Sequence, residues 1–288
     1  MDVVVFEDRP ELRSPLLVCA FGGWNDAGES ASGALQFLRD RWGARRFAWI
    51  DPEEFYDFQV NRPTVRLVDG VTRRIDWPAA EFFHAALPER DIVLFSGLEP
   101  SVRWRTFSEA IVSTGMDLGC ERLVTLGGFL ADLPHTQPIR VTGSAPTTDE
   151  AERLGMSASR YEGPTGIVGV LHEASNRLGL SSISLWAAVP HYLPSGPNPK
   201  AALALVERLA RVAEVDVRTD DLARAVVGWS ERIDGIVAEN AELTDYVDRL
   251  ETAADLTGDD VPDIPTGDEL AKELERFLRS QPGEDPPG

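Results

Sequence analysis

The sequence predicts an α/β fold in which a mostly parallel sheet is sandwiched by helices, followed by a C-terminal acidic helical hairpin. Three observations predict this fold. Several short apolar runs are continuous rather than alternating, which is typical of strands covered on both faces. Helical patterns separate these runs, as in chains that form parallel sheets. The last quarter of the chain carries a heptad pattern instead.

The predicted elements of the sheet region follow one another closely along the chain. Strands are expected at 3–6, 16–21, 45–50, 91–97, 122–128, 139–145 and 182–189. Helices are expected at 26–42, 104–118, 164–178 and 198–213. Asp69-Gly70 lies between two short β-branched runs, so residues 64–76 are predicted to form a β-hairpin.

The C-terminal quarter differs in both periodicity and charge. Its apolar positions are separated by alternating steps of four and three, which predicts one long helix over about 220–255. The seam formed by these positions consists of Leu222, Val226, Trp229, Ile233, Ile236, Asn240, Leu243, Val247 and Leu250. We interpret it as an interaction seam, either with another chain or, as is frequent for short seams, within an internal helix pair. Asn240 then either fixes the register or faces water at the edge of the pair.

A second helix is expected to open at the capping box Thr266–Glu269 and to return along the first. Residues 214–288 contain 21 Asp/Glu and 7 Lys/Arg, so this region holds most of the net charge of −20. We therefore predict an α/β core domain at 1–217, a helical extension at 218–280 and a disordered tail at 281–288.

Composition excludes several classes of function. The net charge of −20 argues against nucleic acid as a partner, because an acidic surface repels phosphate. The chain contains two lysines, Lys200 and Lys272, and neither follows a strand and a glycine-rich loop. Schiff-base chemistry and Walker-type nucleotide sites both need such a lysine. We therefore expect no cofactor.

The cysteines and histidines indicate a cytoplasmic protein without a metal site. Cys19 and Cys120 have neither zinc nor redox spacing and are interpreted as small buried side chains in a reducing compartment. The four histidines share no metal-binding spacing. No signal peptide precedes the first strand, and no apolar run is long enough to span a membrane.

The most informative segment is GGWNDAG at 22–28, where a buried strand runs into glycines and then into a helix. Ligands of open α/β sheets bind where strands end and helices begin. The segment is also compatible with a purely structural strand-to-helix turn, in which Asn25 or Asp26 caps the helix. The spacing of its glycines is not that of a dinucleotide site.

Two further loops follow predicted strands and are expected to converge with the first loop. A ligand-binding cleft would then include Gly22, Gly23, Trp24, Asn25, Asp26, Glu99, Gly127, Gly128 and His191. Asp26, Glu99 and His191 are the candidate catalytic residues, since paired carboxylates and a histidine can perform acid–base chemistry. Surface carboxylates are far more often structural than catalytic, so the residues favour a non-enzymatic protein.

Taken together, GGWNDAG (22–28), SGLEP (96–100), YEGPTG (161–166) and AAVPHYL (187–193) resemble the proteasome assembly chaperone 2 family, in particular its actinobacterial members. The resemblance covers about residues 1–255. It implies a phosphorylase/hydrolase-like α/β core with a helical extension, and it implies self-association as a homo-oligomer. Similar proteins of eukaryotes and archaea are non-enzymatic chaperones that bind proteasome α subunits.

The resemblance therefore makes a self-associating, chaperone-like interaction module the leading hypothesis, with proteasome subunits as candidate partners. The chaperones dock through a C-terminal hydrophobic–tyrosine–X tail, whereas this sequence ends Asp285-Pro-Pro-Gly288. An ATP-grasp activity, which such sequences are sometimes assigned, is disfavoured by the scarcity of lysine. The alternative is a small-molecule-binding or hydrolase/phosphorylase-like enzyme acting at the cleft around Asn25, Asp26, Glu99 and His191.

Overall fold

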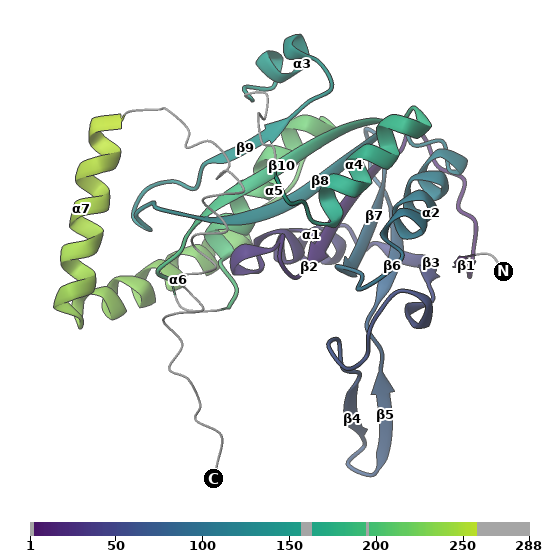
Figure 1. The fold of residues 1–288 in the computed structure, drawn as a ribbon, viewed down its shortest axis with the longest axis horizontal. Coiled ribbons are helices and arrows are strands. Elements are labelled where there is room, and N and C mark those ends of the chain that lie inside the picture. The colour runs from purple at the N-terminus through teal and green to yellow at the C-terminus, as the bar shows by residue number, and fades with distance from the viewer. Residues whose placement is uncertain (1–2, 157–162, 194–195, 258–288) are drawn as a thin grey trace.

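The computed structural model describes residues 3–156, 163–193 and 196–257, and the elements within them are shown in Figure 1. The strands of this part of the chain are β1 (Val4–Phe6), β2 (Leu16–Gly22), β3 (Arg45–Ile50), β4 (Thr64–Val68), β5 (Thr72–Asp76), β6 (Ala80–Ala86), β7 (Asp91–Leu98), β8 (Arg122–Ala131), β9 (Val141–Ser144) and β10 (Ser181–Pro190). The α-helices are α1 (Ser30–Arg41), α2 (Trp104–Asp117), α3 (Thr148–Arg153), α4 (Ile167–Leu178), α5 (Pro199–Ala213), α6 (Asp220–Ala238) and α7 (Ala241–Thr257).

Eight strands form one mixed sheet in the order β1-β3-β6-β7-β2-β8-β10-β9. The four central strands β7, β2, β8 and β10 are parallel to one another, as predicted. The outer pairs on both sides, from β1 to β7 and between β10 and β9, are antiparallel. The sheet is therefore parallel where it is most deeply covered and antiparallel toward its edges.

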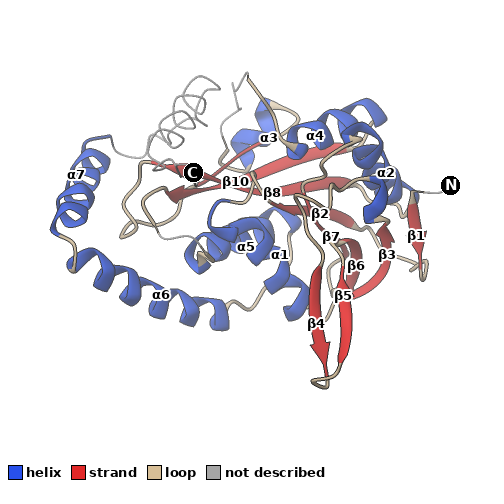
Figure 2. Ribbon diagram, turned by 60° about the horizontal axis from the view of Figure 1, so that its bottom comes forward, coloured by secondary structure: helices blue, strands red, loops and turns tan. Residues whose placement is uncertain are grey.

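Helices cover both faces of the sheet, so the core has three layers (Figure 2). Alternate residues of β2 point to opposite faces: Leu16, Val18 and Ala20 enter the layer under α1 and α5. Leu17, Cys19 and Phe21 enter the layer under α2 and α4. Because both faces are buried, the strand is apolar at every position, which explains the continuous run in the sequence. The predicted α/β fold is confirmed.

Two elements of the core were not predicted, and two helices begin later than predicted. β6 (Ala80–Ala86) and the short α3 were missed. The helix predicted from 26 is a 3-10 turn at Ala27–Glu29 followed by α1. The helix predicted from Pro164 begins at Ile167, where Gly166 is the N-cap residue.

The predicted hairpin is present as β4 and β5, which project from the body of the molecule (Figure 1). Asp69 and Gly70 both have positive φ, at 53° and 73°. These values suit a two-residue turn whose twist matches the flanking strands. All but one of the residues in the two strands are exposed.

The prediction of one long helix over 220–255 is wrong, because this segment forms two helices. α6 ends at Ala238, and α7 turns sharply away from it (Figures 1 and 2). Asn240 lies between the two helices and is exposed, which agrees with the alternative in which it faces water. Its Oδ1 accepts a hydrogen bond from the Leu243 N–H at 3.2 Å, so it caps the first turn of α7. An asparagine at this place stops one helix and starts the next, because its side chain competes for backbone donors.

The boundaries at residues 217 and 280 stay predictions. The returning helix after Thr266 and the tail at 281–288 lie outside the described residues. None of the helices within the described residues has the length and apolar character of a membrane span.

His172 on α4 provides a pH-dependent test of the fold. Its Nε2 lies 2.8 Å from Thr125 Oγ1 on β8 and its Nδ1 lies 2.8 Å from Ser182 Oγ on β10. Burial lowers the pKa of His172 to about 4. In an unfolded chain the pKa of histidine is about 6.5. Between this value and the lower pKa of the folded state, the unfolded state binds more protons, so the free energy of unfolding falls as the pH falls through that range.

We expect this group to remove about 2 kcal/mol of the free energy of unfolding between pH 6.5 and 5. Urea unfolding at the two pH values measures the loss, and His172→Gln should reduce the pH slope by that amount. His191→Gln controls for the loss of a histidine elsewhere. Equal slopes for wild type and His172→Gln would contradict the prediction.

Asn240 provides a test of the break between α6 and α7. Asn240→Ala should destabilise the start of α7 by about 1 kcal/mol, whereas Asn240→Asp retains an accepting oxygen and should be close to wild type. Hydrogen exchange of the amides at 243–247 measures the difference. If alanine slows exchange there, residues 220–257 prefer one continuous helix and the cap has no such role.

Candidate functional site

The loops after β2 and β7 meet at the carboxyl edge of the parallel strands. β2 ends at Gly22, which is in register with Leu98 at the end of β7. The Glu99 N–H donates to the Gly22 carbonyl at 3.0 Å, so the two loops remain together after the strands end. This edge is where open α/β sheets bind ligands.

Asn25 and Glu99 are brought together, as predicted. Asn25 is buried, and its Nδ2 donates to Glu99 Oε1 at 3.1 Å. The same carboxylate oxygen accepts from the backbone N–H of Ile167 at 2.7 Å. Ile167 is the first residue of α4, whose N-cap Gly166 offers no side chain. Glu99 therefore caps α4 from a distant loop, and its negative charge lies at the positive end of the helix dipole.

Gly166 is required by this arrangement. A Cβ placed on Gly166 would lie 2.6 Å from both polar atoms of the Asn25 side chain and 2.8 Å from Glu99 Oε1. Three segments, the loops after β2 and β7 and the start of α4, thus close onto one another with no space for a methyl group.

Asp26 is occupied by the backbone of its own helix. Its Oδ1 accepts from the N–H groups of Ala31 at 2.7 Å and Ser32 at 3.1 Å, and its Oδ2 accepts from Ser32 Oγ. Burial raises the pKa of Asp26, while the hydrogen bonds from Ser32 and Ala31 oppose that rise. The carboxylate caps α1 across the preceding 3-10 turn.

The backbone around Asp26 is held by β8. The Asn25 carbonyl accepts from the Gly128 N–H at 2.8 Å, and Asp26 forms an isolated parallel bridge with Gly128. A Cβ on Gly128 would lie 2.1 Å from Ser30 Oγ. Gly127 next to it faces the Trp186 ring, which a Cβ would approach to 2.5 Å. Both glycines serve close packing.

His191 belongs to a different cluster from Asn25, Asp26 and Glu99. Its Nδ1 lies 3.0 Å from Asp132 Oδ1 and its Nε2 lies 3.5 Å from Tyr246 Oη. The His191 ring also packs edge-on against Tyr192 and Tyr246, with centroid distances of 5.8 and 5.7 Å. Its contacts are with the C-terminal helices and the end of β8, so the predicted convergence of four residues is limited to the pair Asn25–Glu99.

His135, in the loop after β8, anchors the same C-terminal helices, although it is not among the residues of the predicted cleft. It is buried, its Nδ1 lies 2.7 Å from Tyr192 Oη, and its Nε2 lies 3.0 Å from Asp234 Oδ1 on α6. Lys200 donates to the His135 carbonyl at 2.6 Å. Burial raises the pKa of Tyr192 to about 12, so this phenol stays protonated at neutral pH. No spacing signal connects these residues, because they are 57 to 99 positions apart.

The predicted seam is divided between burial and exposure. Trp229, Ile233 and Val247 are buried against Tyr192 and Leu193 of the core, together with Val237 and the partly buried Leu243. Leu222 packs against the layer under α1 and α5. Ile236, by contrast, is 42% exposed, and Asn240 is exposed. A straight helix drifts relative to a heptad, so the buried stripe of α6 follows Trp229, Ile233 and Val237.

Exposed apolar side chains gather at the carboxyl edge and on the hairpin. Trp24 is 60% exposed and Val102, in the loop after β7, is 50% exposed. We define the arm as residues 60–77, which contain β4 and β5. Seven of the 14 exposed large apolar residues of the described chain lie in the arm. Such a concentration marks a protein-binding surface more often than a catalytic one.

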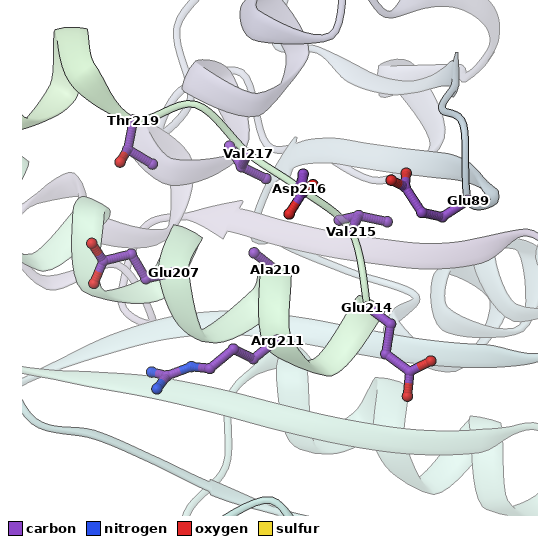
Figure 3. A pocket seen from close by; sticks show the side chains of 9 residues that line it. All are labelled: Glu89, Glu207, Ala210, Arg211, Glu214, Val215, Asp216, Val217 and Thr219. Carbon is purple, nitrogen blue, oxygen red and sulfur yellow. The ribbon is translucent and has the colours of Figure 1, made fainter.

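A depression of about 750 Å³ lies at the other end of the sheet, beside the connection between α5 and α6 (Figure 3). We call it the acidic depression, and its lining consists of Glu89, Glu207, Ala210, Arg211, Glu214, Val215, Asp216, Val217 and Thr219. Among the described residues, no cluster of His, Cys, Asp and Glu has the arrangement of a metal site.

Gly166→Ala tests whether the edge is a packed junction. The clash with Asn25 and Glu99 should lower the free energy of unfolding by about 2 kcal/mol, measured by urea unfolding. Gly228→Ala on α6 is the matched control, because a Cβ there meets nothing within 4 Å. A Gly166→Ala protein as stable as the control would mean that the three segments do not close together.

Comparisons with known proteins agree with this architecture. The family model described as the PAC2 family matches residues 20–237. A PAC2 family protein from Streptomyces avermitilis is 44% identical, with a TM-score of 0.75, over 81% of this chain and 99% of that one. A proteasome-assembly chaperone homologue from Mycobacterium tuberculosis is also 44% identical, with a TM-score of 0.74 and the same coverage.

A more distant structure shares the fold. PbaB of Pyrococcus furiosus, an archaeal proteasome activator, is 18% identical with a TM-score of 0.62, over 81% of this chain and 97% of that one. The two relatives at 44% identity come from actinobacteria, in agreement with the resemblance of the sequence motifs. The chain belongs to the PAC2 family.

Proposed function

We propose that this protein is a non-enzymatic, chaperone-like interaction module that associates with itself and with proteasome subunits in the cytoplasm. The observation that carries the proposal is the contrast at the carboxyl edge. The polar groups of Asn25, Asp26 and Glu99 are used internally, while Trp24 and Val102 at the same edge are exposed. An edge of this kind offers apolar contact area to a protein partner.

The family supports the class of partner. One relative at 44% identity is described as a proteasome-assembly chaperone homologue, and the more distant PbaB as a proteasome activator. Both are similar in fold over more than three quarters of this chain. We extend the partner class of these relatives to this chain, with proteasome α subunits as the first candidates.

The structure gives less support to the enzymatic alternative. An acid–base pair needs groups that can exchange protons with a substrate. Asp26 accepts three hydrogen bonds from its own helix, and Glu99 accepts two from protein donors. His191 contacts Asp132 and the C-terminal helices instead. A hydrolase or phosphorylase at this edge would have to break the caps of α1 and α4 in order to act.

The test is binding to purified proteasome α and β subunits, combined with the rate of core-particle assembly followed by native gels. We expect binding at micromolar concentrations and a changed assembly rate. Trp24→Ser should weaken binding at least tenfold, because a large exposed ring at an interface centre contributes strongly to affinity. Val227→Ser, at an exposed site on α6, is the matched control and should bind normally.

Absence of both binding and any change in assembly rate would exclude the assembly role. If the protein binds but Trp24→Ser behaves like Val227→Ser, the carboxyl edge is not the surface used. Both variants replace exposed side chains, so we expect both to fold like the wild type. Thermal unfolding verifies this before binding is measured.

A further inference from the structure

The arm has one apolar face that nothing in the described chain covers. Val65 and Leu67 on β4 lie on the same face as Ile75 and Arg73 on β5, because Val65 pairs with Ile75 and Leu67 pairs with Arg73. Val65, Leu67 and Ile75 are each more than half exposed, and Val71 at the tip is 85% exposed. An isolated two-stranded hairpin is only marginally stable in water, so a partner surface would also stabilise it.

The charge of the arm is opposite to that of the rest of the chain. The arm carries four Arg and two Asp within a protein of net charge −20. Arg66 and Arg74 pair with Asp76 inside the arm. Arg62 and Arg73 form no ion pair within the described chain and are exposed. Arg73 lies beside Leu67, so the uncovered face combines apolar contact area with a positive charge.

The acidic depression has the complementary composition. Figure 3 shows Ala210, Val215, Asp216 and Val217 near its centre, with Glu207, Glu89 and Glu214 around them. Its lining contains four carboxylates and one arginine. Within the described residues none of these carboxylates takes part in an ion pair.

The arm of a chain cannot enter the depression of the same chain. The arm leads directly into Ala80, which pairs with Gly97 near the carboxyl end of β7. Glu89 lies in the turn at the other end of the same strand pair, where Ala86 pairs with Asp91. These ends are separated by the length of an eight-residue strand, about 26 Å. A contact between the arm and the depression would therefore join two molecules.

We propose that the arm of one copy docks into the acidic depression of a second copy of this chain. The uncovered face supplies Leu67 and Ile75 to Ala210, Val215 and Val217, and Arg73 to the carboxylates that surround them. The contact joins two different surfaces, so repetition builds a closed ring or an open filament rather than a two-fold dimer. This proposal rests on the self-association in the proposed function and specifies the surfaces that perform it.

Light scattering coupled to gel filtration measures the oligomeric state of the full chain. Wild type should be larger than a monomer at micromolar concentrations and should dissociate as salt is raised, since the contact includes exposed charges. The arm variant Leu67→Asp/Arg73→Glu and the depression variant Glu89→Lys/Glu207→Lys should each raise the dissociation constant at least tenfold. Val227→Asp and Glu231→Lys/Glu239→Lys, which change exposed residues of α6 and its end, should leave it unchanged.

Mixing the two defective variants gives the decisive result. The arm variant still has an intact depression, and the depression variant still has an intact arm. The mixture should therefore form a one-to-one heterodimer that grows no further. If the arm variant alone abolishes assembly and the mixture stays monomeric, arms pair with arms or with an unrelated surface, and the proposal is wrong.

Failure of this proposal can be distinguished from failure of the proposed function. A wild-type protein that stays monomeric yet binds proteasome subunits rules out docking between copies while the assembly role stands. A wild-type protein that assembles through these surfaces but ignores proteasome subunits gives the opposite result. If α subunits displace the arm variant from the arm of the depression variant, the arm serves an external partner and does not dock into a second copy.

Discussion

The packing of the loops at the carboxyl edge of the parallel strands depends on one carboxylate oxygen. Glu99 Oε1 receives hydrogen bonds from the Asn25 side chain and from the first N–H of α4, and so joins two loops and a helix that are far apart in the sequence. An uncompensated charge is costly even at a partly buried position, and the Glu99 carboxylate is balanced by two donors and a helix dipole. Gly166 permits the approach, because any side chain there would occupy the same space. Asn25 of GGWNDAG and Gly166 of YEGPTG meet at this junction, so residues of two family motifs also pack the fold together.

Local signals explain which parts of the fold could be predicted. The apolar runs of β2, β7 and β8 are continuous because both faces of these strands are buried. Each run can be recognised from a short stretch of sequence alone. The hairpin turn could be predicted because Asp69-Gly70 is a pair that favours a two-residue turn with positive φ. β6 was missed because AEFFHAA contains alanine, glutamate and histidine and lacks the β-branched residues on which strand prediction relies. The break at Asn240 was missed because a regular heptad describes apolar spacing only, whereas the end of a helix depends on where one side chain finds a donor.

Some contacts at the candidate site could be predicted from the sequence, whereas others depend on how the whole chain folds. Asn25 and Glu99 could be paired in advance because both follow parallel strands, whose carboxyl ends meet. The attachment of His191 to Tyr246, and of His135 to Asp234, depends on where the C-terminal helices fold back, and no spacing encodes that position. The same limit explains why the seam was interpreted as a possible contact between chains. Its residues Trp229 and Ile233 are instead buried against Tyr192 and Leu193, in the loop that follows β10.

The projecting hairpin affects how much of this protein can accumulate without aggregating when no partner covers the arm. β4 and β5 form a sheet of two strands, so each has an outer edge of unpaired backbone donors and acceptors. Such edges recruit further strands, and the apolar side chains beside them favour that recruitment. The four arginines and Pro63 of the arm oppose uncontrolled stacking by charge repulsion and by the missing N–H of proline. Synthesis of this chain in excess over whatever covers the arm is therefore expected to produce aggregates that begin at residues 64–76.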